Sequence, residues 1–266
     1  MTSKILIGIH GAAGRMGQRL VALGAADEQL QVTAALENAS HPRLGEDAGL
    51  VAGHGQLDVP LSAELTSDVA VIIDFSVPAA LQGIVELCRA KSIPLVVATT
   101  GLDEEQQELL KETATEIPLV WAPNMSMAVN LTMQLTAMAA KVLGKVSSGV
   151  DAEVIDRHHR YKEDSPSGTA LKFGQIIAEG MGQTDHVHGR EGILGARPQT
   201  EIGYHALRVG DNPGEHTIVF GMLGETIELT VRATNRDCYA LGALAAAKYL
   251  AGKDPGLYAM NDVLGL

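Results

Sequence analysis

Short apolar runs alternate with amphipathic stretches along the first half of the chain. Buried strands are predicted at residues 4–9, 32–36, 69–74, 94–98 and 119–121. Leu20, Val21 and Leu23 follow the first run at helical spacing, and further helices are predicted at 79–90 and 104–116. Residues 38–65, rich in proline and glycine, are predicted to form a loop. Strands that alternate with helices predict a doubly wound parallel sheet with helices on both faces.

The pattern changes after residue 125. A long apolar helix is predicted at 130–143, followed by strands at 153–155, 200–207, 215–222 and 226–231. These strands favour an antiparallel or mixed sheet, and hence a second, smaller α+β domain. A helix at 237–250 then returns, and we expect the last residues to pack back on the first domain.

Composition narrows the class of protein. The chain has 266 residues, of which 46% are hydrophobic, and a formal net charge of -12, which argues against a nucleic-acid-binding surface. Cys88 and Cys238 are far apart in sequence, so no disulfide framework is predicted and a reducing compartment fits. No apolar run is long enough to cross a membrane. We therefore expect a cytoplasmic protein with neither a nucleic acid nor a membrane as partner.

A glycine-rich turn follows the first predicted strand and reads Gly11-Ala12-Ala13-Gly14-Arg15-Met16-Gly17. Glycines in such a turn let the backbone approach a pyrophosphate at the start of a helix. Glu37 ends the second strand, twenty residues beyond Gly17, where a carboxylate can bind the ribose hydroxyls of a dinucleotide. The other interpretation of Glu37 is a solvated strand end, and the upstream turn favours the cofactor role.

Polar residues follow the later strands at Asp74-Phe75-Ser76, Ala98-Thr99-Thr100-Gly101 and Ala122-Pro123-Asn124-Met125. Ligands of parallel sheets bind outside the carboxyl ends of the strands. Small hydroxyl and amide groups there suit a nicotinamide, whose carboxamide needs donors and acceptors. A purely structural role as turn residues stays open for Ser76 and Thr99.

The stretch at 153–170 carries the strongest chemical signal. It gathers His158, His159, Arg160 and Lys162 within five positions and then enters a helix after Ser165-Pro166-Ser167-Gly168-Thr169. The first N–H groups of a helix lack partners within it, so they suit a carboxylate or phosphate. A basic loop before an ordinary capped helix is the alternative. The histidines, the lysine and the glycine together favour an anion site with proton donors.

Other histidines are assigned structural roles. His186 and His188 form a pair without a third or fourth ligand, so we predict loop or interface roles and no metal site. His205 and His216 lie in predicted strands and are expected to be cross-strand partners rather than catalysts.

Taken together, these motifs resemble the 4-hydroxy-tetrahydrodipicolinate reductase family, also called dihydrodipicolinate reductases, over essentially the whole chain. The resemblance rests on the glycine turn, the three strand-end motifs and, above all, residues 153–170. It implies an oxidoreductase of lysine biosynthesis, in the diaminopimelate route, that reduces 4-hydroxy-tetrahydrodipicolinate with NADH, NADPH or both. It also implies a Rossmann-like domain at 1–125 and 235–266, and a substrate-binding domain at 126–234 that forms a homotetramer.

The resemblance carries roles onto matching residues. It implies that Gly11 to Gly17 hold the pyrophosphate and Glu37 the ribose, and that a further set lies on the nicotinamide side: Ala98, Thr99, Thr100, Ala122, Pro123, Asn124 and Met125. His158 is implied as proton donor or acceptor and Lys162 as proton donor. The carboxylates of a small dicarboxylate substrate would contact His159, Gly168 and Thr169.

Four positions depart from the family pattern. Asn38 follows Glu37 where arginine is frequent, which favours NADH over NADPH, although Arg43 is a second candidate for a 2′-phosphate. Met125, Ala128 and Arg232 stand where phenylalanine, glycine and histidine are familiar. Two alternatives stay open. One is a related enzyme resembling aspartate or homoserine dehydrogenase, and the other is a catalytically silent module that senses NADH.

Overall fold

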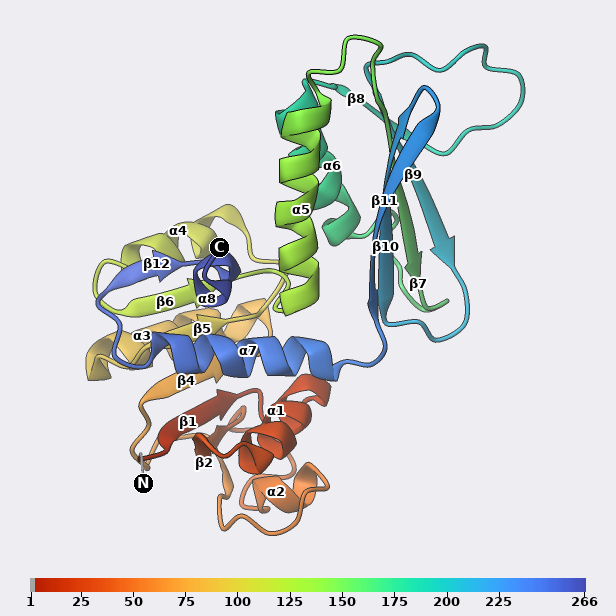
Figure 1. Cartoon of the computed structure of the whole chain (residues 1–266). Coiled ribbons are helices and arrows are strands. Elements are labelled where there is room, and N and C mark those ends of the chain that lie inside the picture. The colour runs from red at the N-terminus through yellow and green to blue at the C-terminus, as the bar shows by residue number, and fades with distance from the viewer. Residues whose placement is uncertain (1–2) are drawn as a thin grey trace. The chain divides into compact units, whose positions relative to one another are not determined.

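The computed structural model describes residues 3–266, which form two compact units (Figure 1). The first unit contains the described residues up to Met127 together with Arg236–Leu266, and the second contains Ala128–Asn235. The chain therefore leaves the first unit after Met127 and returns to it at Arg236.

The first unit is built on a seven-stranded sheet in the order β12-β6-β5-β4-β1-β2-β3. All neighbouring strands are parallel, and their bounds are Ile5–His10 (β1), Leu30–Leu36 (β2), Leu61–Ser62 (β3), Val71–Asp74 (β4), Leu95–Val97 (β5), Pro118–Trp121 (β6) and Gly256–Tyr258 (β12). The strand order reverses between β1 and β4, as in a Rossmann fold, and ligands of such sheets bind at this switch point.

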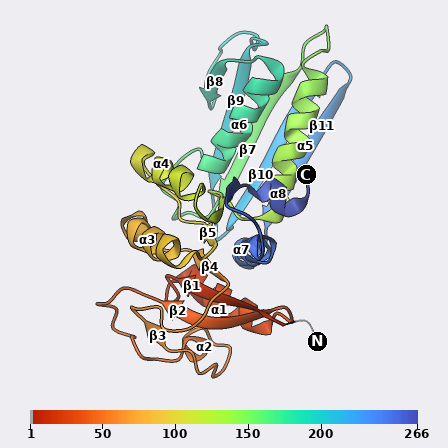
Figure 2. The ribbon, with the colours of Figure 1, turned by 90° about the vertical axis from the view of Figure 1, so that its left-hand side faces the viewer.

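Helices cover both faces of this sheet, which explains why its strands are apolar on both sides. Their bounds are Arg15–Ala26 (α1), Ala48–Val51 (α2), Leu81–Lys91 (α3), Glu104–Thr113 (α4), Asp237–Leu250 (α7) and Met260–Leu264 (α8), with a 3₁₀ turn at Pro78–Ala80 before α3. Ile73 packs in one hydrophobic cluster with residues of α1 and α7, whereas its neighbour Ile72 packs in another with residues of α3 and α4. Figure 2 shows α3 and α4 on one side of the strands and α7 on the other.

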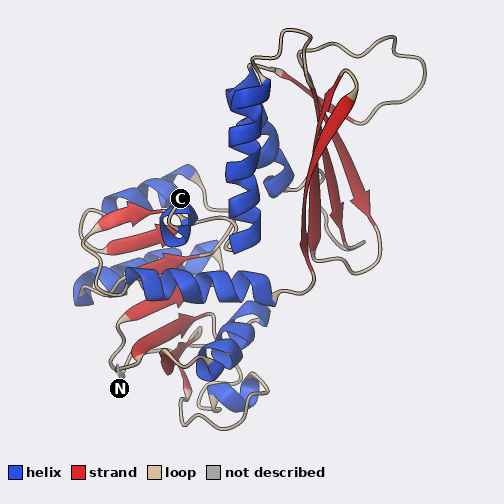
Figure 3. Ribbon diagram, in the orientation of Figure 1, coloured by secondary structure: helices blue, strands red, loops and turns tan. Residues whose placement is uncertain are grey.

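The second unit is a five-stranded mixed sheet in the order β11-β10-β7-β9-β8. Its strands are Asp151–His158 (β7), Asp185–His188 (β8), Glu201–Arg208 (β9), Gly214–Met222 (β10) and Glu225–Ala233 (β11). The strand β7 is parallel to β9 and antiparallel to β10. Helices Met127–Leu143 (α5) and Gly168–Met181 (α6) lie on one face, where Phe173 and Ile177 pack against Val154 and Ile218 (Figure 3). The predicted fold class, a Rossmann-like sheet plus a smaller mixed-sheet domain, is confirmed.

Several local predictions were wrong. The predicted loop at 38–65 contains α2 and β3, because the Asp47 side chain caps α2 and also accepts the backbone N–H groups of Leu57 and Val59. His186 and His188, predicted to have loop or interface roles, lie in strand β8 beside β9 and not in a loop. Among the described residues, no helix is long and apolar enough to cross a membrane.

Candidate active site

The glycine turn connects β1 to α1 in a conformation that only glycine fits at two positions. Gly11 has a φ of +78°, and a Cβ atom there would lie 2.9 Å from the carbonyl oxygen of Phe75. A Cβ atom on Gly17 would lie 2.1 Å from the carbonyl oxygen of Gly11. Gly14 is the N-cap residue and supplies no side-chain cap to α1. The turn therefore presents bare backbone at a helix N-terminus, the arrangement that binds a pyrophosphate.

Glu37 lies beside this turn. Its Oε2 accepts the backbone N–H of Ala13 at 3.0 Å, and its Oε1 accepts that of Asn38 at 3.0 Å. The structure thus brings together the two features that the sequence pairs, the turn and the acidic residue at the end of β2. Arg15 and Met16 begin α1, with Arg15 exposed.

The ends of β1, β4 and β5 meet at the side chain of Asp74, which is fully buried. Its Oδ1 contacts His10 Nδ1 at 2.7 Å and accepts from the Ser76 hydroxyl at 2.6 Å, and its Oδ2 accepts from the Thr99 hydroxyl at 2.7 Å. The hydroxyl groups of Ser76 and Thr99, which were predicted from the sequence as candidate ligand contacts, therefore donate hydrogen bonds to Asp74. Ala98 is buried beside them, whereas Thr100 is exposed.

The segment after β6 reaches the same edge of the sheet. Ala122 donates its N–H to the Val97 carbonyl at 3.2 Å, and the Asn124 side chain accepts the Ser126 N–H at 2.9 Å. Pro123 is exposed and Met125 is buried. The carboxyl ends of β1, β2, β5 and β6 thus carry the predicted cofactor residues along one edge of the parallel sheet.

The cationic residues of the second unit follow the end of β7. His158 ends the strand, and the next residues turn: the His159 N–H donates to the Asn212 carbonyl at 2.8 Å, and the Lys162 N–H donates to the His159 carbonyl at 3.2 Å. Lys162 Nζ pairs with Asp164 Oδ1 at 2.7 Å.

Helix α6 begins beside this turn. Its N-cap Ser167 accepts the Ala170 N–H at 3.2 Å, and its first residues are Gly168 and Thr169. A Cβ atom on Gly168 would meet nothing within 4 Å, and the residue is exposed. Lysine, histidines and a helix N-terminus are suited to binding an anion.

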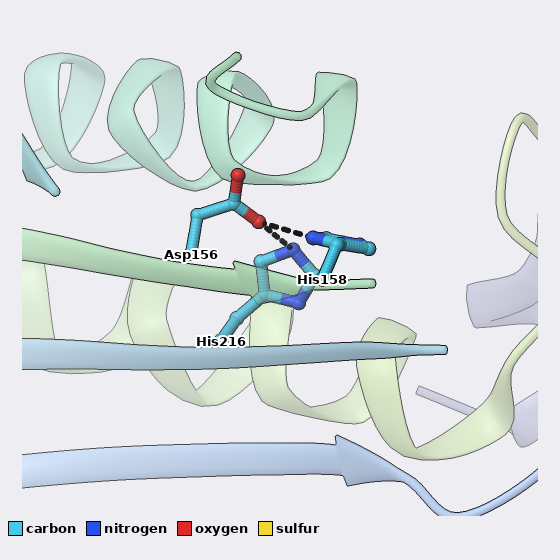
Figure 4. Close-up of side chains that lie close together, drawn as sticks. All are labelled: Asp156, His158 and His216. Carbon is cyan, nitrogen blue, oxygen red and sulfur yellow. Dashed lines mark ion pairs between the residues drawn. The ribbon is translucent and has the colours of Figure 1, made fainter. Parts of the chain in front are cut away.

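A buried network lies beneath this turn and centres on Asp156 (Figure 4). Asp156 Oδ2 accepts the Ser167 N–H at 2.9 Å and the Arg208 guanidinium at 3.0 Å. Its Oδ1 accepts the Ser167 hydroxyl at 3.0 Å and lies 2.7 Å from His158 Nδ1 and 3.4 Å from His216 Nε2. The His158 contact has the length of an ion pair but not the alignment of a hydrogen bond.

Burial and local contacts shift the pKa values of Asp156 and His216 in this network. Burial alone would raise the pKa of Asp156, but contacts with His158, His216 and the Ser167 N–H outweigh it and hold that pKa well below its usual range. For His216 burial dominates and lowers the pKa below 6.5, although Asp156 opposes this shift. Asp156 is therefore a buried anion beside a neutral His216 at pH 7.

Asp156, His158 and His216 offer three ligand atoms within 4.8 Å of one another, as a metal centre would. Both Asp156 oxygens, however, already accept hydrogen bonds from Ser167, and Oδ2 also contacts the Arg208 guanidinium. A metal cation would lie beside that guanidinium and displace these donors. The contacts therefore favour a hydrogen-bonded network, and no metal centre is proposed.

Sequence reasoning missed Asp156, Ser167 and Arg208 as parts of this site. The alternation of Asp156 and His158 on one strand was an available signal, since residues two apart face the same side. His216 and His205 are cross-strand partners as predicted, of Asp156 and Glu153 respectively. His186 lies in a strand and bonds the Tyr204 hydroxyl at 2.7 Å.

The order of the seven strands, with a glycine turn at the switch point, places the first unit in the class of Rossmann folds, which commonly bind dinucleotides. Models of the N-terminus and C-terminus of dihydrodipicolinate reductase match residues 5–125 and 128–264. The chain therefore belongs to the dihydrodipicolinate reductase family, which confirms the resemblance seen in the sequence.

Individual relatives agree with this assignment. The chain is 56% identical to 4-hydroxy-tetrahydrodipicolinate reductase of Rhodopirellula baltica, covering 100% of this chain and 98% of the relative. It is 46% identical to the enzyme of the same name from Syntrophotalea carbinolica, over 98% and 99%. A dipicolinate-bound dihydrodipicolinate reductase from Paenisporosarcina sp. TG-14 has a TM-score of 0.76 and 25% identity, over 96% and 97% of the two chains.

Proposed function

We propose that the chain reduces 4-hydroxy-tetrahydrodipicolinate to tetrahydrodipicolinate, in the diaminopimelate route of lysine biosynthesis. The observation that carries this proposal is the cationic cluster at the end of β7, next to the start of α6. Its members are His158, His159 and Lys162. Their side chains can carry positive charge, which suits a dicarboxylate, and can donate protons to the reduced substrate. A nicotinamide cofactor, when bound, supplies the hydride.

Residues of the second unit manage charge and protons. The substrate is a cyclic imine with two carboxylates and a hydroxyl at C4, and loss of that hydroxyl as water would give a conjugated imine. Hydride addition at C4 would then move an electron pair toward nitrogen and leave an enamine that must be protonated at carbon. His158 and Lys162 are the proposed proton donors, a role that needs a positioned acid. His159 and the N–H groups of Gly168 and Thr169 would hold a carboxylate. Lys162 would exchange Asp164 for the substrate.

The first unit fits the cofactor. Gly11 to Gly17 lead into a helix start without a side-chain cap. The Glu37 carboxylate lies beside this turn, where it can bind ribose hydroxyls. Residues 98–100 and 122–125 lie along the same edge of the sheet. These observations support a dinucleotide-binding role for residues 1–125 and 235–266 and a substrate-binding role for 126–234.

The preferred cofactor is proposed to be NADH. Glu37 points a carboxylate at the turn, where a 2′-phosphate would be repelled, and Asn38 brings no compensating charge. Arg43 is already paired with Glu46, its Nη2 lying 2.8 Å from Oε2.

Asn38→Arg should therefore raise kcat/KM for NADPH relative to NADH by about 10- to 100-fold, since a hydrogen bond between charged groups contributes about 1.5–3 kcal/mol. Initial rates with each cofactor measure the ratio. Arg43→Ala is the control and should leave the ratio near that of the wild type. A large loss of NADPH use in Arg43→Ala would assign phosphate recognition to Arg43 instead.

The decisive assay follows oxidation of NADH while pyruvate and aspartate semialdehyde condense to form the substrate in place. Oxidation that requires both precursors supports the proposal. Binding of NADH without oxidation would point to another substrate or to a silent sensor.

Lys162→Ala should then lower kcat by about 10²–10⁴-fold, the usual contribution of a general acid, and leave NADH affinity unchanged. Lys172→Ala, on the exposed face of α6, is the matched control and should behave as the wild type. Equal losses of turnover and NADH affinity in Lys162→Ala would remove Lys162 from the proton-transfer step.

A homotetramer is proposed through the second unit. Its two helices lie on one face of the five-stranded sheet, and among the described residues of that unit no helix lies on the other (Figure 3). Sedimentation analysis measures the assembly. A location in the cytoplasm stays a prediction.

A further inference from the structure

Asp156 is a fully buried carboxylate. The roles proposed for His158 and Lys162 as proton donors do not say what this carboxylate does. It lies two residues before His158 on β7, so both side chains point to the same face of the sheet. Burying an isolated carboxylate is costly, and such a group persists only where donors compensate. The number and origin of its donors therefore indicate what it does.

Groups from three separate elements hold this carboxylate. Ser167, at the start of α6, donates twice, Arg208 of β9 donates to Oδ2, and His216 of β10 lies against Oδ1. A carboxylate bound from so many directions cannot rotate. It therefore offers a fixed acceptor at 2.7 Å to one ring nitrogen of His158, Nδ1.

We infer that Asp156 is a positioning residue for His158: it keeps a proton on Nδ1 and leaves Nε2 to exchange a proton with the substrate. This inference rests on the proposed reductase function. The histidine ring is held further by His216, whose ring packs edge-on with centroids 5.3 Å apart. A fixed negative charge 2.7 Å from one ring nitrogen favours the proton on that nitrogen, and so favours one tautomer of the ring.

The proton balance is simple. When His158 protonates the enamine carbon, the Nε2–H bond breaks, a C–H bond forms, and the imidazolium becomes a neutral ring that keeps its proton on Nδ1. Asp156 stays ionised throughout. The charged and titratable groups around this pair are His216 on β10, Arg208 on β9, and Lys162 and Asp164 in the turn.

The test compares Asp156→Asn with Asp156→Glu in the coupled assay. Asparagine keeps the shape but removes the charge, which disfavours a protonated neighbour. We expect Asp156→Asn to lower kcat about 10²-fold with unchanged NADH affinity, and to move the alkaline limb of the pH–rate profile to lower pH. Asp156→Glu should restore the position of that limb.

Asp74→Asn is the matched control, because Asp74 is an equally buried aspartate that contacts no proposed acid. It should leave the alkaline limb where it is in the wild type. A folded Asp156→Asn enzyme with the kcat and pH profile of the wild type would overturn the inference.

A second measurement needs no variant and no turnover. Long-range ¹H–¹⁵N correlation spectra of the wild-type protein report which ring nitrogen of His158 carries the proton. Protonation at Nδ1 in the neutral ring is expected, and the Nε2 tautomer would refute the positioning role. An inactive wild type with the Nδ1 tautomer would instead sink the proposed function while leaving this contact standing.

Discussion

Two turns in this chain lead from a strand into a helix at a proposed anion site, and they are built differently. The turn from β1 to α1 is shaped by glycines, and its helix has no side-chain cap. The segment from the end of β7 to α6 carries His158 on the strand and His159 and Lys162 in the turn, and Ser167 caps the helix. The first suits a pyrophosphate that needs close backbone contact, and the second suits a substrate that also needs proton transfer.

A buried aspartate underlies each turn. Asp74 contacts His10, the residue before Gly11, and Asp156 contacts Ser167, the residue before Gly168. The partners differ, since Asp74 is held by two hydroxyls and one histidine, whereas Asp156 is held by a guanidinium, a serine and two histidines. The comparison indicates that Asp74 holds strand ends together. Asp156 also joins its neighbouring elements, and in addition it places a negative charge beside His158.

The largest effect should come from Gly17→Ala. The added Cβ would meet three backbone atoms of the turn, at 2.1 Å from the Gly11 oxygen, 2.6 Å from Ala12 Cα and 2.8 Å from the Ala12 carbonyl carbon, so the turn must move. We expect a stability loss of about 1–3 kcal/mol and a fall in NADH affinity of about 10²-fold. Denaturant unfolding and fluorescence titration with NADH measure the two effects.

Gly83→Ala is the matched control in the same unit. A Cβ there meets nothing within 4 Å, and alanine on an exposed helix is about 0.5–1 kcal/mol more stable than glycine. NADH affinity should be that of the wild type. If Gly17→Ala binds NADH as well as Gly83→Ala does, the glycine turn is not the pyrophosphate site.

A smaller effect is expected on the pH dependence of stability at the second turn. The pKa of His216 is lowered by burial, so the unfolded chain binds more protons than the native protein just below pH 6.5. Stability from this group is therefore complete above about pH 6.5 and is lost as the pH falls toward the native pKa. Asp156, whose pKa is also lowered, adds a loss only below about pH 4.

His216→Gln should remove the first of these losses. The difference in the free energy of unfolding between wild type and variant is expected to be larger at pH 7.5 than at pH 5.5. Urea denaturation at the two pH values measures it. Parallel curves for the two proteins would show that His216 is not a buried neutral imidazole.

Most of the fold follows from periodicity that the sequence carries. The helix Asp237–Leu250 ends where it was predicted, because a long amphipathic run leaves little freedom in its bounds. Strands β3 and β12 were not predicted, because two or three residues are too few to show an alternating pattern of hydrophobic and polar positions. They exist because β2 and β6 offer unpaired edges, which is a tertiary effect.

Some parts of the candidate site could likewise be predicted from the sequence, and others could not. His158, His159 and Lys162 stand in one short segment, so their chemistry could be predicted together. Arg208 lies 52 residues from Asp156, and only the parallel pairing of β7 with β9 brings them into contact. The proposed proton donors were therefore visible in the sequence, whereas the groups that hold Asp156 depend on strand register.

The smallest effect should come from Gly168→Ala, which isolates ligand contact from folding at the second turn. The added Cβ meets no atom within 4 Å and keeps the backbone N–H, so the thermal midpoint should not fall. Crowding of a bound carboxylate should raise KM for the substrate about tenfold, part of what a charge-assisted hydrogen bond contributes, with little change in kcat. Gly174→Ala on the same helix gives the opposite pattern, because its Cβ would collide with the Tyr204 hydroxyl and destabilise the second unit. An unchanged KM in a stable Gly168→Ala protein would contradict a close approach of the substrate to the Cβ position of this residue.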